Sequence, residues 1–276
     1  MISQKQKELA KRFMSMHAGR DIFVLPNIWD AGSALIFEKQ GFGAVATTSA
    51  GIAYSAGCPD GEQISIDDLA THVKIITGRI NIPLSVDFER GYSEDPGVVK
   101  QNAKLLVECG AVGCNIEDGL PNGELSSVKE QIDKIKALAE LKLELDLPFV
   151  INARTCIFWL ESGEESERLS VAIDRANAYA EAGADCIFIP GALNEATVKA
   201  LVKNINAPVN IILNTKFNDL CRLRELGVRR LSIGSSAARN VLEHTIKLAV
   251  EIKDGYTASL INTGLSYDDA NNYFDD

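Results

Sequence analysis

Four segments of this chain repeat one local pattern: the end of a helix, a glycine, and the start of an apolar strand. They read EKQGFGAV, ECGAV, EAGAD and ELGVR, and they begin at Glu38, Glu108, Glu181 and Glu225. Glycine tolerates the left-handed backbone conformation with which many helices end. Because strand and helix keep alternating, the strands must run in one direction, and the pattern predicts a parallel sheet.

Eight apolar runs are the candidate strands, and helical patterns lie between them. They span residues 23–26, 44–48, 84–88, 112–117, 149–154, 186–190, 209–213 and 230–234. Eight strand–helix units in 276 residues fit a closed (β/α)8 barrel of the TIM type, preceded by an extra helix at residues 3–17. We therefore expect one domain over residues 1–276; the alternative is an open, doubly wound sheet.

Residues 255–276 read as a C-terminal extension of the barrel. Five acidic residues and no Lys or Arg lie between positions 254 and 276. The segment YDDANNYF forms either a short helix packed on a neighbouring element or a solvated tail.

Composition excludes some partners. A formal net charge of -10 and a pI near 4.9 oppose binding to nucleic acid or to an anionic membrane, because both carry negative charge. No apolar run approaches the roughly 20 residues of a transmembrane helix, and the opening MISQKQKELAKRF is too polar for a secretory signal. We expect a cytoplasmic protein whose partners are small molecules or further copies of itself.

Polar residues occupy alternate positions at the ends of three expected strands, LSVDFE, GCNIED and FVINAR. Alternate side chains of a strand share one face. The shared faces carry Ser85, Asp87 and Glu89 in the first strand, Asn115 and Glu117 in the second, and Asn152 and Arg154 in the third. Burying these charges is unfavourable unless they hold one another, a metal or a ligand. The sequence therefore predicts an enzyme site here.

In a barrel of this class the site lies at the carboxyl ends of the strands. Thr47, Ser49, Asp60 and Asn214 are expected at the same rim. Carboxylates at this density indicate Mg²⁺, which prefers oxygen ligands and keeps several waters. The alternative is a metal-free network in which Asp87 and Glu89 pair with Arg154 or Arg90. The segment Ser49-Ala50-Gly51 is expected to form a tight turn whose backbone N–H groups bind an anion. The alternative is that the small residues are needed only to form the turn.

Histidine and cysteine carry no comparable signal. His17, His72 and His244 fall in expected helices remote from the strand ends, so we do not expect a histidine base. The six cysteines show no zinc spacing, and we expect Cys156 to be a packed thiol. Asp30 and Asp118 are expected in loops or helix caps.

Six motifs, in this order, resemble the phosphoenolpyruvate mutase and isocitrate lyase superfamily. They are NIWDAGSA (27–34), TTSAGIAYSAGCPDGE (47–62), VDFERGYSEDP (86–96), GAVGCNIEDG (110–119), INART (151–155) and LGVRRLSIGS (226–235). The resemblance implies a (β/α)8 barrel, often with its last helix swapped between subunits of a homodimer or homotetramer. It also implies Mg²⁺ as the cofactor, bound by Asp87 directly and through waters by Asp60, Glu89 and Glu117.

The implied substrate is a 2-oxo acid, or a hydroxy acid that is cleaved to one. Ser49, Ala50, Gly51 and Arg154 match positions that bind its carboxylate and carbonyl. Asp87 and Asn214 are expected to complete the substrate-binding set, and the residues expected to take part in catalysis are Arg154, Glu117 and Asn122.

The loop after Asp118 departs from the lyase pattern. Lyases that cleave isocitrate or methylisocitrate carry lysines, a cysteine, a glycine and a histidine there, and the cysteine serves as acid or base. This chain reads EDGLPNGELS, without Cys, Lys or His, which argues against those two reactions. Phosphonate mutases have a lysine and an asparagine in this loop, and only Asn122 is present here. We expect the loop to close over the site and Asn122 to supply a hydrogen bond.

The leading hypothesis is a Mg²⁺-dependent lyase that acts on a small 2-oxo or 2-hydroxy dicarboxylate through an enolate, as in the decarboxylation of oxaloacetate. A mutase or hydrolase of a carbon–phosphorus bond is the second hypothesis. A barrel that binds a metabolite without turning it over is the third. A phosphosugar enzyme that binds phosphate at Gly234 and Ser235 is the fourth.

Overall fold

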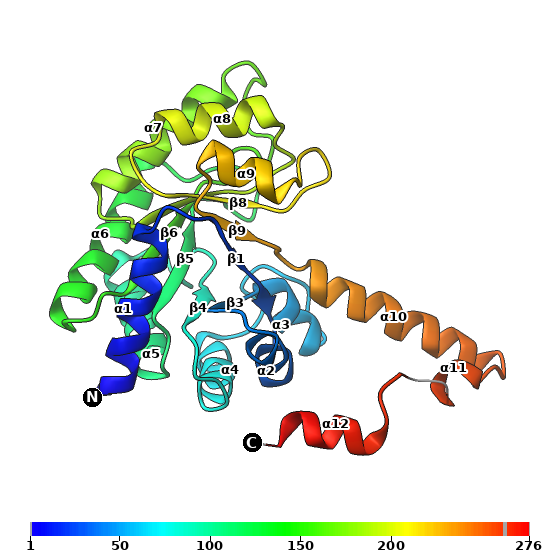
Figure 1. Ribbon diagram of the computed structural model, residues 1–276. Helices are drawn as coiled ribbons and strands as arrows, with labels where there is room; N and C mark the ends of the chain where they lie inside the picture. Colours follow the sequence, from blue (N-terminus) through cyan, green and yellow to red (C-terminus); the bar gives the residue numbers. More distant parts are fainter. Residues whose placement is uncertain (1, 262–263, 276) are drawn as a thin grey trace.

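The computed structural model describes residues 2–261 and 264–275, in which parallel strands and surrounding helices alternate along the chain (Figure 1). The strands are β1 (Phe23–Leu25), β2 (Asn27–Ile28), β3 (Val45–Thr47), β4 (Leu84–Asp87), β5 (Gly113–Glu117), β6 (Val150–Arg154), β7 (Cys186–Ile189), β8 (Val209–Ile212) and β9 (Arg230–Ser232). The helices are α1 (Gln4–Ala18), α2 (Ala31–Lys39), α3 (Ser49–Ser55), α4 (Ile66–Thr77), α5 (Pro96–Glu108), α6 (Val128–Glu144), α7 (Arg168–Glu181), α8 (Glu195–Asn204), α9 (Leu220–Leu226), α10 (Ser236–Lys253), α11 (Ala258–Ile261) and α12 (Tyr267–Phe274).

The sheet closes around Pro26, which ends the first expected strand and separates β1 from a further strand, β2. The strand order in the sheet is β1-β9-β8-β7-β6-β5-β4-β3-β2. β1 pairs with β9 and β2 pairs with β3, so the two edge strands of the sheet are consecutive in the chain and bring its edges together. Proline has no N–H to donate, although the Pro26 carbonyl accepts a hydrogen bond from Ala46 N at 2.9 Å. The result is a nearly closed TIM-type barrel, which confirms the expected fold. The described residues form nine strands rather than eight, and the open, doubly wound alternative is wrong.

The repeated glycine pattern has the expected geometry. Gly41, Gly110, Gly183 and Gly227 follow helices α2, α5, α7 and α9 with φ of 87°, 104°, 113° and 90°. A side chain at these positions would be strained, which explains why glycine ends each helix.

Helix α1 confirms the expected N-terminal helix and covers the amino ends of the strands. Ser3 caps it, and the buried Gln6 donates to the carbonyls of Val107 and Ala111 at 2.7 and 3.0 Å. Phe13 packs against Gly113, the first residue of β5, and leaves no room for a side chain there. The carboxyl ends of the strands remain at the opposite end of the barrel.

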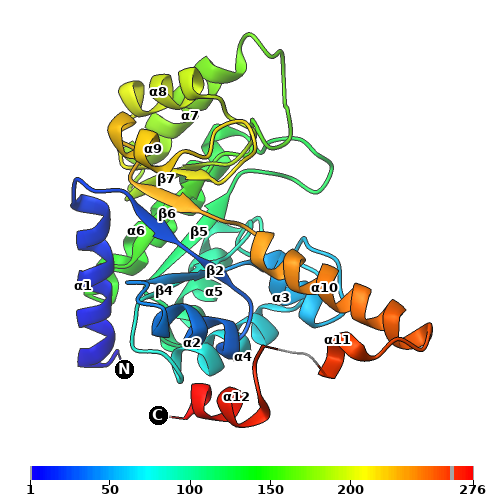
Figure 2. The same cartoon turned by 45° about the vertical axis from the view of Figure 1, so that its right-hand side comes forward.

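The C-terminal helices leave the barrel. α10 points away from the sheet in both views, and the chain then returns so that α12 lies beside α2 (Figures 1 and 2). Lys39 donates to the carbonyl of Tyr273, and Gln40 contacts its hydroxyl at 3.1 Å. YDDANNYF is thus helical and contacts the body of the protein; residues 262, 263 and 276 of the extension lie outside the described residues. No helix in the described part of the chain is long and apolar enough to cross a membrane.

Stability should depend on the buried His17. Its Nδ1 lies 2.9 Å from the Phe13 carbonyl, and burial lowers its pKa from 6.5 to about 3. Below pH 6.5 the unfolded chain therefore binds a proton that the folded protein excludes, and stability falls. Relative to His17→Leu, the wild type should lose about 2 kcal/mol of unfolding free energy between pH 7 and pH 5. Urea titrations at both pH values measure this difference; His244→Gln, at an exposed position, should show no such effect, and parallel curves for wild type and His17→Leu would contradict the prediction.

Candidate active site

One cavity of about 430 Å³ lies at the carboxyl ends of the strands. Parallel strands share a direction, so closing the barrel gathers residues that are far apart in sequence at a single rim. Eight of the ten expected site residues line the cavity: Ser49, Ala50, Asp60, Asp87, Glu89, Glu117, Arg154 and Asn214. Ser235, the alternative phosphate position, lines the same cavity and defines no separate site.

Asp87 ends β4 and is surrounded by hydrogen-bond donors. Its Oδ2 accepts from Ser49 N at 3.2 Å and from Ser49 Oγ at 3.1 Å, and its Oδ1 accepts from Asn115 Nδ2 at 3.3 Å. The backbone is fixed as well, because Asp87 N donates to Thr47 Oγ1 at 2.7 Å. In the described residues no Lys or Arg forms a salt bridge with this carboxylate, so neutral dipoles hold a charge that remains available to a ligand.

The metal-free network considered from the sequence does not form. Arg90 pairs with Glu62 and Glu94, and Arg154 pairs with Glu117 at 2.7 Å. In the part of the chain described, neither Asp87 nor Glu89 therefore has an arginine partner.

Three carboxyl groups near Asp87 have raised pKa values. Burial, and then the charge of Asp87, raises the pKa of Asp60. Burial raises the pKa of Glu89 to about 8, with repulsion from Asp87, Asp60 and Glu117 adding to it. Burial also raises the pKa of Glu117 to about 7, although Arg154 opposes the shift. The cavity thus gathers carboxyl groups that repel one another, and the opposing effect of Arg154 does not cancel the shifts.

This donor set fits Mg²⁺ held mainly through water. Within residues 2–261 and 264–275, no three His, Cys, Asp or Glu side chains are grouped closely enough to hold a metal by themselves. Mg²⁺ does not need such a cage, because it is commonly bound by one or two carboxylates and keeps its waters. Asp87 as the direct ligand, with Asp60, Glu89 and Glu117 bonded to those waters, agrees with the mutual repulsion of the four groups.

Arg154 ends β6 and is fixed by one carboxylate and two aromatic rings. Glu117 pairs with it in the strand register, and the guanidinium carbon lies 5.7 Å from the ring centres of both Trp159 and Phe188. Its buried Nε has no hydrogen-bond partner among the described residues. A guanidinium held in one plane presents paired donors to a ligand carboxylate. Sequence reasoning missed both aromatic residues, since they carry no polar signal and Phe188 lies in an apolar strand.

A buried polar layer supports Asp87 from inside the barrel. Asn152 Nδ2 and Arg230 Nη2 both donate to Asn115 Oδ1, at 2.7 and 3.2 Å. These contacts orient the Asn115 amide so that its Nδ2 faces Asp87. Arg230 is fully buried and was missed by sequence reasoning, because nothing in the adjacent pair Arg229-Arg230 shows which of the two points inward.

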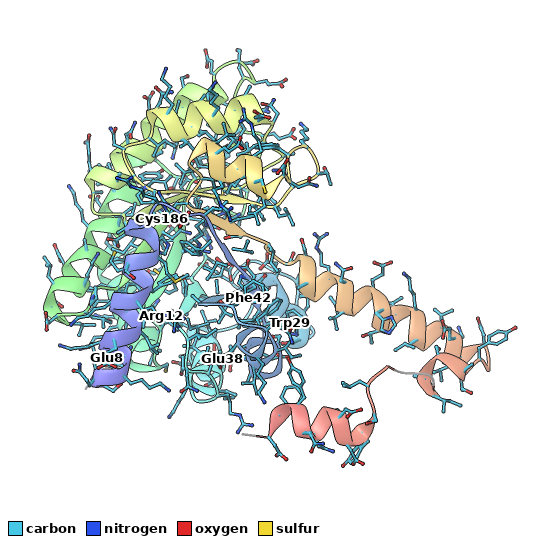
Figure 3. The ribbon with its side chains drawn as sticks, in the orientation of Figure 1. Glu8, Arg12, Trp29, Glu38, Phe42 and Cys186 are labelled. Atoms are coloured by element: carbon cyan, nitrogen blue, oxygen red, sulfur yellow. The ribbon has the colours of Figure 1, made fainter. Side chains whose placement is uncertain are left out.

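Two expected site residues do not line the cavity. Gly51 lies in the first turn of α3 and not in an isolated tight turn. Thr48 caps this helix. A Cβ on Gly51 would come within 2.8 Å of Trp29, which is labelled in Figure 3, so the glycine is required by packing. Ser49 N already donates to Asp87 and Gly51 N to Thr48, so two of the three expected anion-binding amides are engaged.

Asn122 is exposed and bonds to Glu124 through both its amide atoms, at 2.8 and 3.0 Å. The loop forms a small turn with a bridge between Gly119 and Leu125, and Leu120 lines the cavity instead. A hydrogen bond from Asn122 to a substrate stays a prediction that requires this loop to move.

The remaining candidates have structural roles in the described chain. Cys156 is buried, and burial raises the pKa of its thiol, as expected for a packed cysteine. Asp30 caps α2, whereas Asp118 lies in the loop after β5 and binds Arg175 and Tyr179 at 3.1 and 2.8 Å.

Comparison with known proteins identifies the family. The family model described as phosphoenolpyruvate phosphomutase matches residues 13–253. The uncharacterized protein Rv1998c of Mycobacterium tuberculosis H37Rv is 34% identical over 249 residues, 88% of this chain and 89% of that protein. A 2-methylisocitrate lyase of Halalkalibacterium halodurans is 35% identical over 217 residues, 75% of this chain and 68% of the lyase.

Solved structures agree with this assignment. A putative lyase/mutase from Burkholderia cenocepacia J2315 has a TM-score of 0.91 and 32% identity, and covers 99% of this chain and 98% of its own. A phosphonopyruvate hydrolase in complex with oxalate and Mg²⁺ has a TM-score of 0.84 at 22% identity, covering 96% and 94%, which shows a shared fold. The chain belongs to the phosphoenolpyruvate phosphomutase family, and is an enzyme of the phosphoenolpyruvate mutase and isocitrate lyase superfamily.

Metal binding should depend first on Asp87. In Asp87→Ala we expect Mg²⁺ affinity to fall more than about 100-fold, beyond the range for residues that act on a metal through other groups. Asp60→Asn should cost roughly tenfold if it acts through water. Calorimetric titration of Mg²⁺ in the presence of oxalate measures both, and circular dichroism should show that the fold is retained, because the core of the barrel is apolar. Unchanged Mg²⁺ affinity in Asp87→Ala would contradict the assignment.

Proposed function

We propose that the protein is a Mg²⁺-dependent lyase that acts on a small 2-oxo or 2-hydroxy dicarboxylic acid, with oxaloacetate decarboxylation as the leading reaction. The observation that carries the proposal is that Arg154, held by Glu117 and two aromatic rings, lies in the same cavity as four acidic side chains. These are Asp60, Asp87, Glu89 and Glu117. A cation and a guanidinium in one cavity suit a ligand with two adjacent oxygen-bearing groups. The superfamily membership and the oxalate and Mg²⁺ bound by the phosphonopyruvate hydrolase support this.

Each residue at the cavity has a role that follows from its position. Mg²⁺, when bound, supplies the positive charge that stabilises negative charge on the substrate's carbonyl oxygen. Arg154 binds a substrate carboxylate, and Glu117 orients the guanidinium from the neighbouring strand. Ser49 and Ala50, where α3 begins, and Asn214 after β8 contact the remaining polar atoms. The rings of Trp159 and Phe188 line the cavity beside the guanidinium.

The second candidate is a mutase or hydrolase of a carbon–phosphorus bond. Two observations favour it: the matching family model is that of a phosphoenolpyruvate phosphomutase, and the loop 118–126 lacks the Cys, Lys and His that the isocitrate and methylisocitrate reactions require. The relatives that are 2-methylisocitrate lyases favour carbon–carbon cleavage.

A substrate panel separates these candidates. The protein is incubated with oxaloacetate, phosphonopyruvate, carboxyphosphonoenolpyruvate and alkylated malates, with Mg²⁺ or with excess chelator, and pyruvate release is followed. Mg²⁺-dependent turnover of oxaloacetate supports the lyase, and turnover of a phosphonate alone supports the second candidate. Binding without turnover of any member would favour a metabolite-binding barrel and reject the proposal. A cytoplasmic location remains an expectation from the sequence.

Arg154→Lys should separate a substrate contact from a structural ion pair. Lysine keeps the charge opposite Glu117 but lacks the planar pair of donors that a carboxylate accepts. Oxalate affinity in the presence of Mg²⁺ should fall by roughly 10- to 100-fold, since a charged hydrogen bond contributes about 1.5–3 kcal/mol. Competition binding measures it, with Arg168→Lys, outside the cavity lining, as the control. Equal oxalate affinity in wild type and Arg154→Lys would reduce Arg154 to a partner of Glu117.

We also propose that the chain assembles with copies of itself through α10. This helix leaves the barrel and exposes a row of apolar side chains that includes Leu242, Ile246 and Val250, at 39%, 64% and 53% exposure. Residues four positions apart share one helix face, and an apolar face of this length is typical of an interface. A second copy of the chain, with the helix swapped between subunits, would cover it in a dimer or tetramer.

Light scattering should give the mass of a dimer or tetramer for the wild type. Ile246→Asp places a charge in the apolar row and should shift the protein towards the monomer. Leu143→Asp, at an exposed position (81%) on α6, should leave the assembly unchanged. A wild-type monomer, or an assembly indifferent to Ile246→Asp, would reject the α10 interface.

A further inference from the structure

Glu62 connects two loops that carry candidate metal-binding carboxylates. It lies between α3 and α4, two residues after Asp60, and faces the loop that follows β4 and contains Glu89. Its side chain is 12% exposed, so its charge is largely removed from water. Such a carboxylate requires partners, and the neighbouring loop supplies them.

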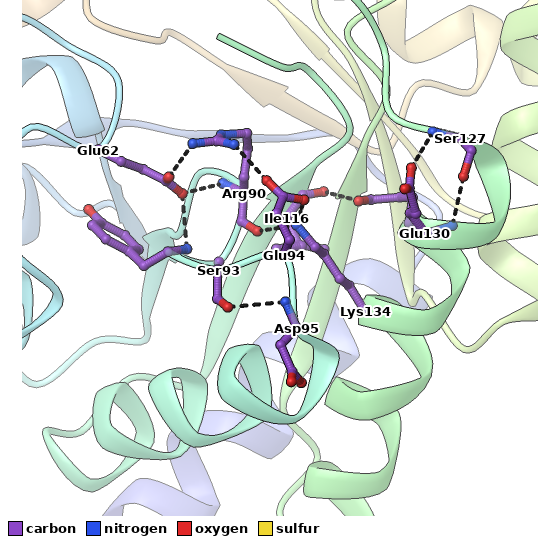
Figure 4. A network of polar contacts seen from close by, with 12 residues as sticks. Glu62, Arg90, Ser93, Glu94, Asp95, Ile116, Ser127, Glu130 and Lys134 are labelled. Carbon is purple, nitrogen blue, oxygen red and sulfur yellow. Dashed lines mark hydrogen bonds and ion pairs between the residues drawn. The ribbon is translucent and has the colours of Figure 1, made fainter.

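The contacts between the two loops are reciprocal. Glu62 N donates to Glu89 Oε2 at 2.7 Å. In return, Glu62 Oε1 accepts from Arg90 N at 3.1 Å and from Tyr92 N at 2.9 Å. Glu62 Oε2 lies 2.5 Å from Arg90 Nη2, which adds an ion pair (Figure 4). Each loop thus satisfies backbone and side-chain groups of the other.

Both loops carry unfavourable backbone conformations at the contact. Glu62, Glu89 and Tyr92 have φ of 54°, 50° and 58°, in the left-handed region that non-glycine residues rarely adopt. Conformations of this kind persist only where the surroundings hold them, and they cluster at functional sites. Here they turn the N–H groups of Arg90 and Tyr92 towards the Glu62 carboxylate.

The contact is anchored on one side and poorly supported on the other. Arg90 also pairs with Glu94 at 2.9 Å, and the buried Lys134 of α6 donates to the Arg90 carbonyl at 3.0 Å (Figure 4). On the Asp60 side, Gly57 and Gly61 have no atom within 4 Å of the position where a Cβ would stand. The loop around Asp60 therefore has few packing contacts to hold it in place.

We propose that Glu62 is a positioning residue that fixes Asp60 and Glu89 relative to one another at the rim of the cavity. It acts through the backbone of the loop after β4 and touches neither the substrate nor the metal. Assigning Asp60 and Glu89 to Mg²⁺ rests on the proposed function, whereas the contact between the loops does not.

The experiment compares three variants of the full chain. Glu62→Ala removes both acceptor oxygens. Glu62→Gln keeps one oxygen for the N–H groups of Arg90 and Tyr92 but loses the ion pair, and it serves if Glu62→Ala does not fold. Glu94→Gln is the matched control, because it removes the other carboxylate from Arg90 and leaves the contacts between the loops intact.

Two measurements are made on each variant. Hydrogen exchange of the metal-free protein follows the amides of residues 56–65 and 89–92, and calorimetry follows Mg²⁺ binding with oxalate. In Glu62→Ala we expect exchange in both segments at least tenfold faster, and Mg²⁺ affinity roughly 10- to 100-fold weaker, as for other residues that support metal ligands. Glu62→Gln should recover part of both effects, and Glu94→Gln should stay within about twofold of wild type.

The outcomes separate the two proposals. Exchange that is unchanged in Glu62→Ala, or in Glu62→Gln should Glu62→Ala not fold, overturns the positioning role whether or not the protein binds Mg²⁺. Equal effects in Glu94→Gln and the Glu62 variants also overturn it, since the effect would then be general to Arg90. A wild type that binds no Mg²⁺ rejects the proposed function alone, and the exchange data still decide the role of Glu62.

Discussion

The site depends on the parallel register between β5 and β6. That register places Glu117 beside Arg154 and Asn115 beside Asn152, so one pair of strands supplies both an ion pair and an amide pair. The ion pair holds a guanidinium at the rim in a single orientation, and the amide pair directs Asn115 towards Asp87. A shift of β6 by one residue would turn Asn152 and Arg154 to the opposite face of the sheet, away from Asn115 and Glu117.

Charge in the cavity is balanced only in part. The pKa values of Asp60, Glu89 and Glu117 are raised by burial and by repulsion from Asp87, and Arg154 opposes the shift at Asp60 and Glu117 without cancelling it. The barrel keeps this arrangement because its support comes from elsewhere: an apolar core, the polar layer around Asn115, and the loop contacts of Glu62. A site that retains repulsion among its own groups is prepared for a cation, and the fold supplies the stability that the site does not.

Membership of the superfamily restricts the range of reactions, but it does not identify the substrate. Asp87 and Glu117 lie on strand ends, which the barrel holds, whereas Asp60 and the segment 118–126 lie in loops. In this chain that loop carries Leu120 and Pro121 at the cavity, and Asn122 faces away from it. The position of this loop is set by a few local contacts, and we expect it to contribute to the choice of substrate.

The sequence by itself determined the parallel barrel, the N-terminal helix, the rim on which the carboxylates gather and the family, because each follows from local periodicity or from motifs that are contiguous in the chain. It did not reveal the strand β2 after Pro26, the burial of Arg230, the rings of Trp159 and Phe188 beside Arg154, or the loop contacts of Glu62. These features join residues that are distant in sequence and, for Phe188 and Arg230, look ordinary in their local context. Only the tertiary structure decided them. Pairing of neighbouring strands places Phe188 beside Arg154 and brings the loop of Asp60 to the end of β4, and closure of the barrel brings the interior of β9 against β5.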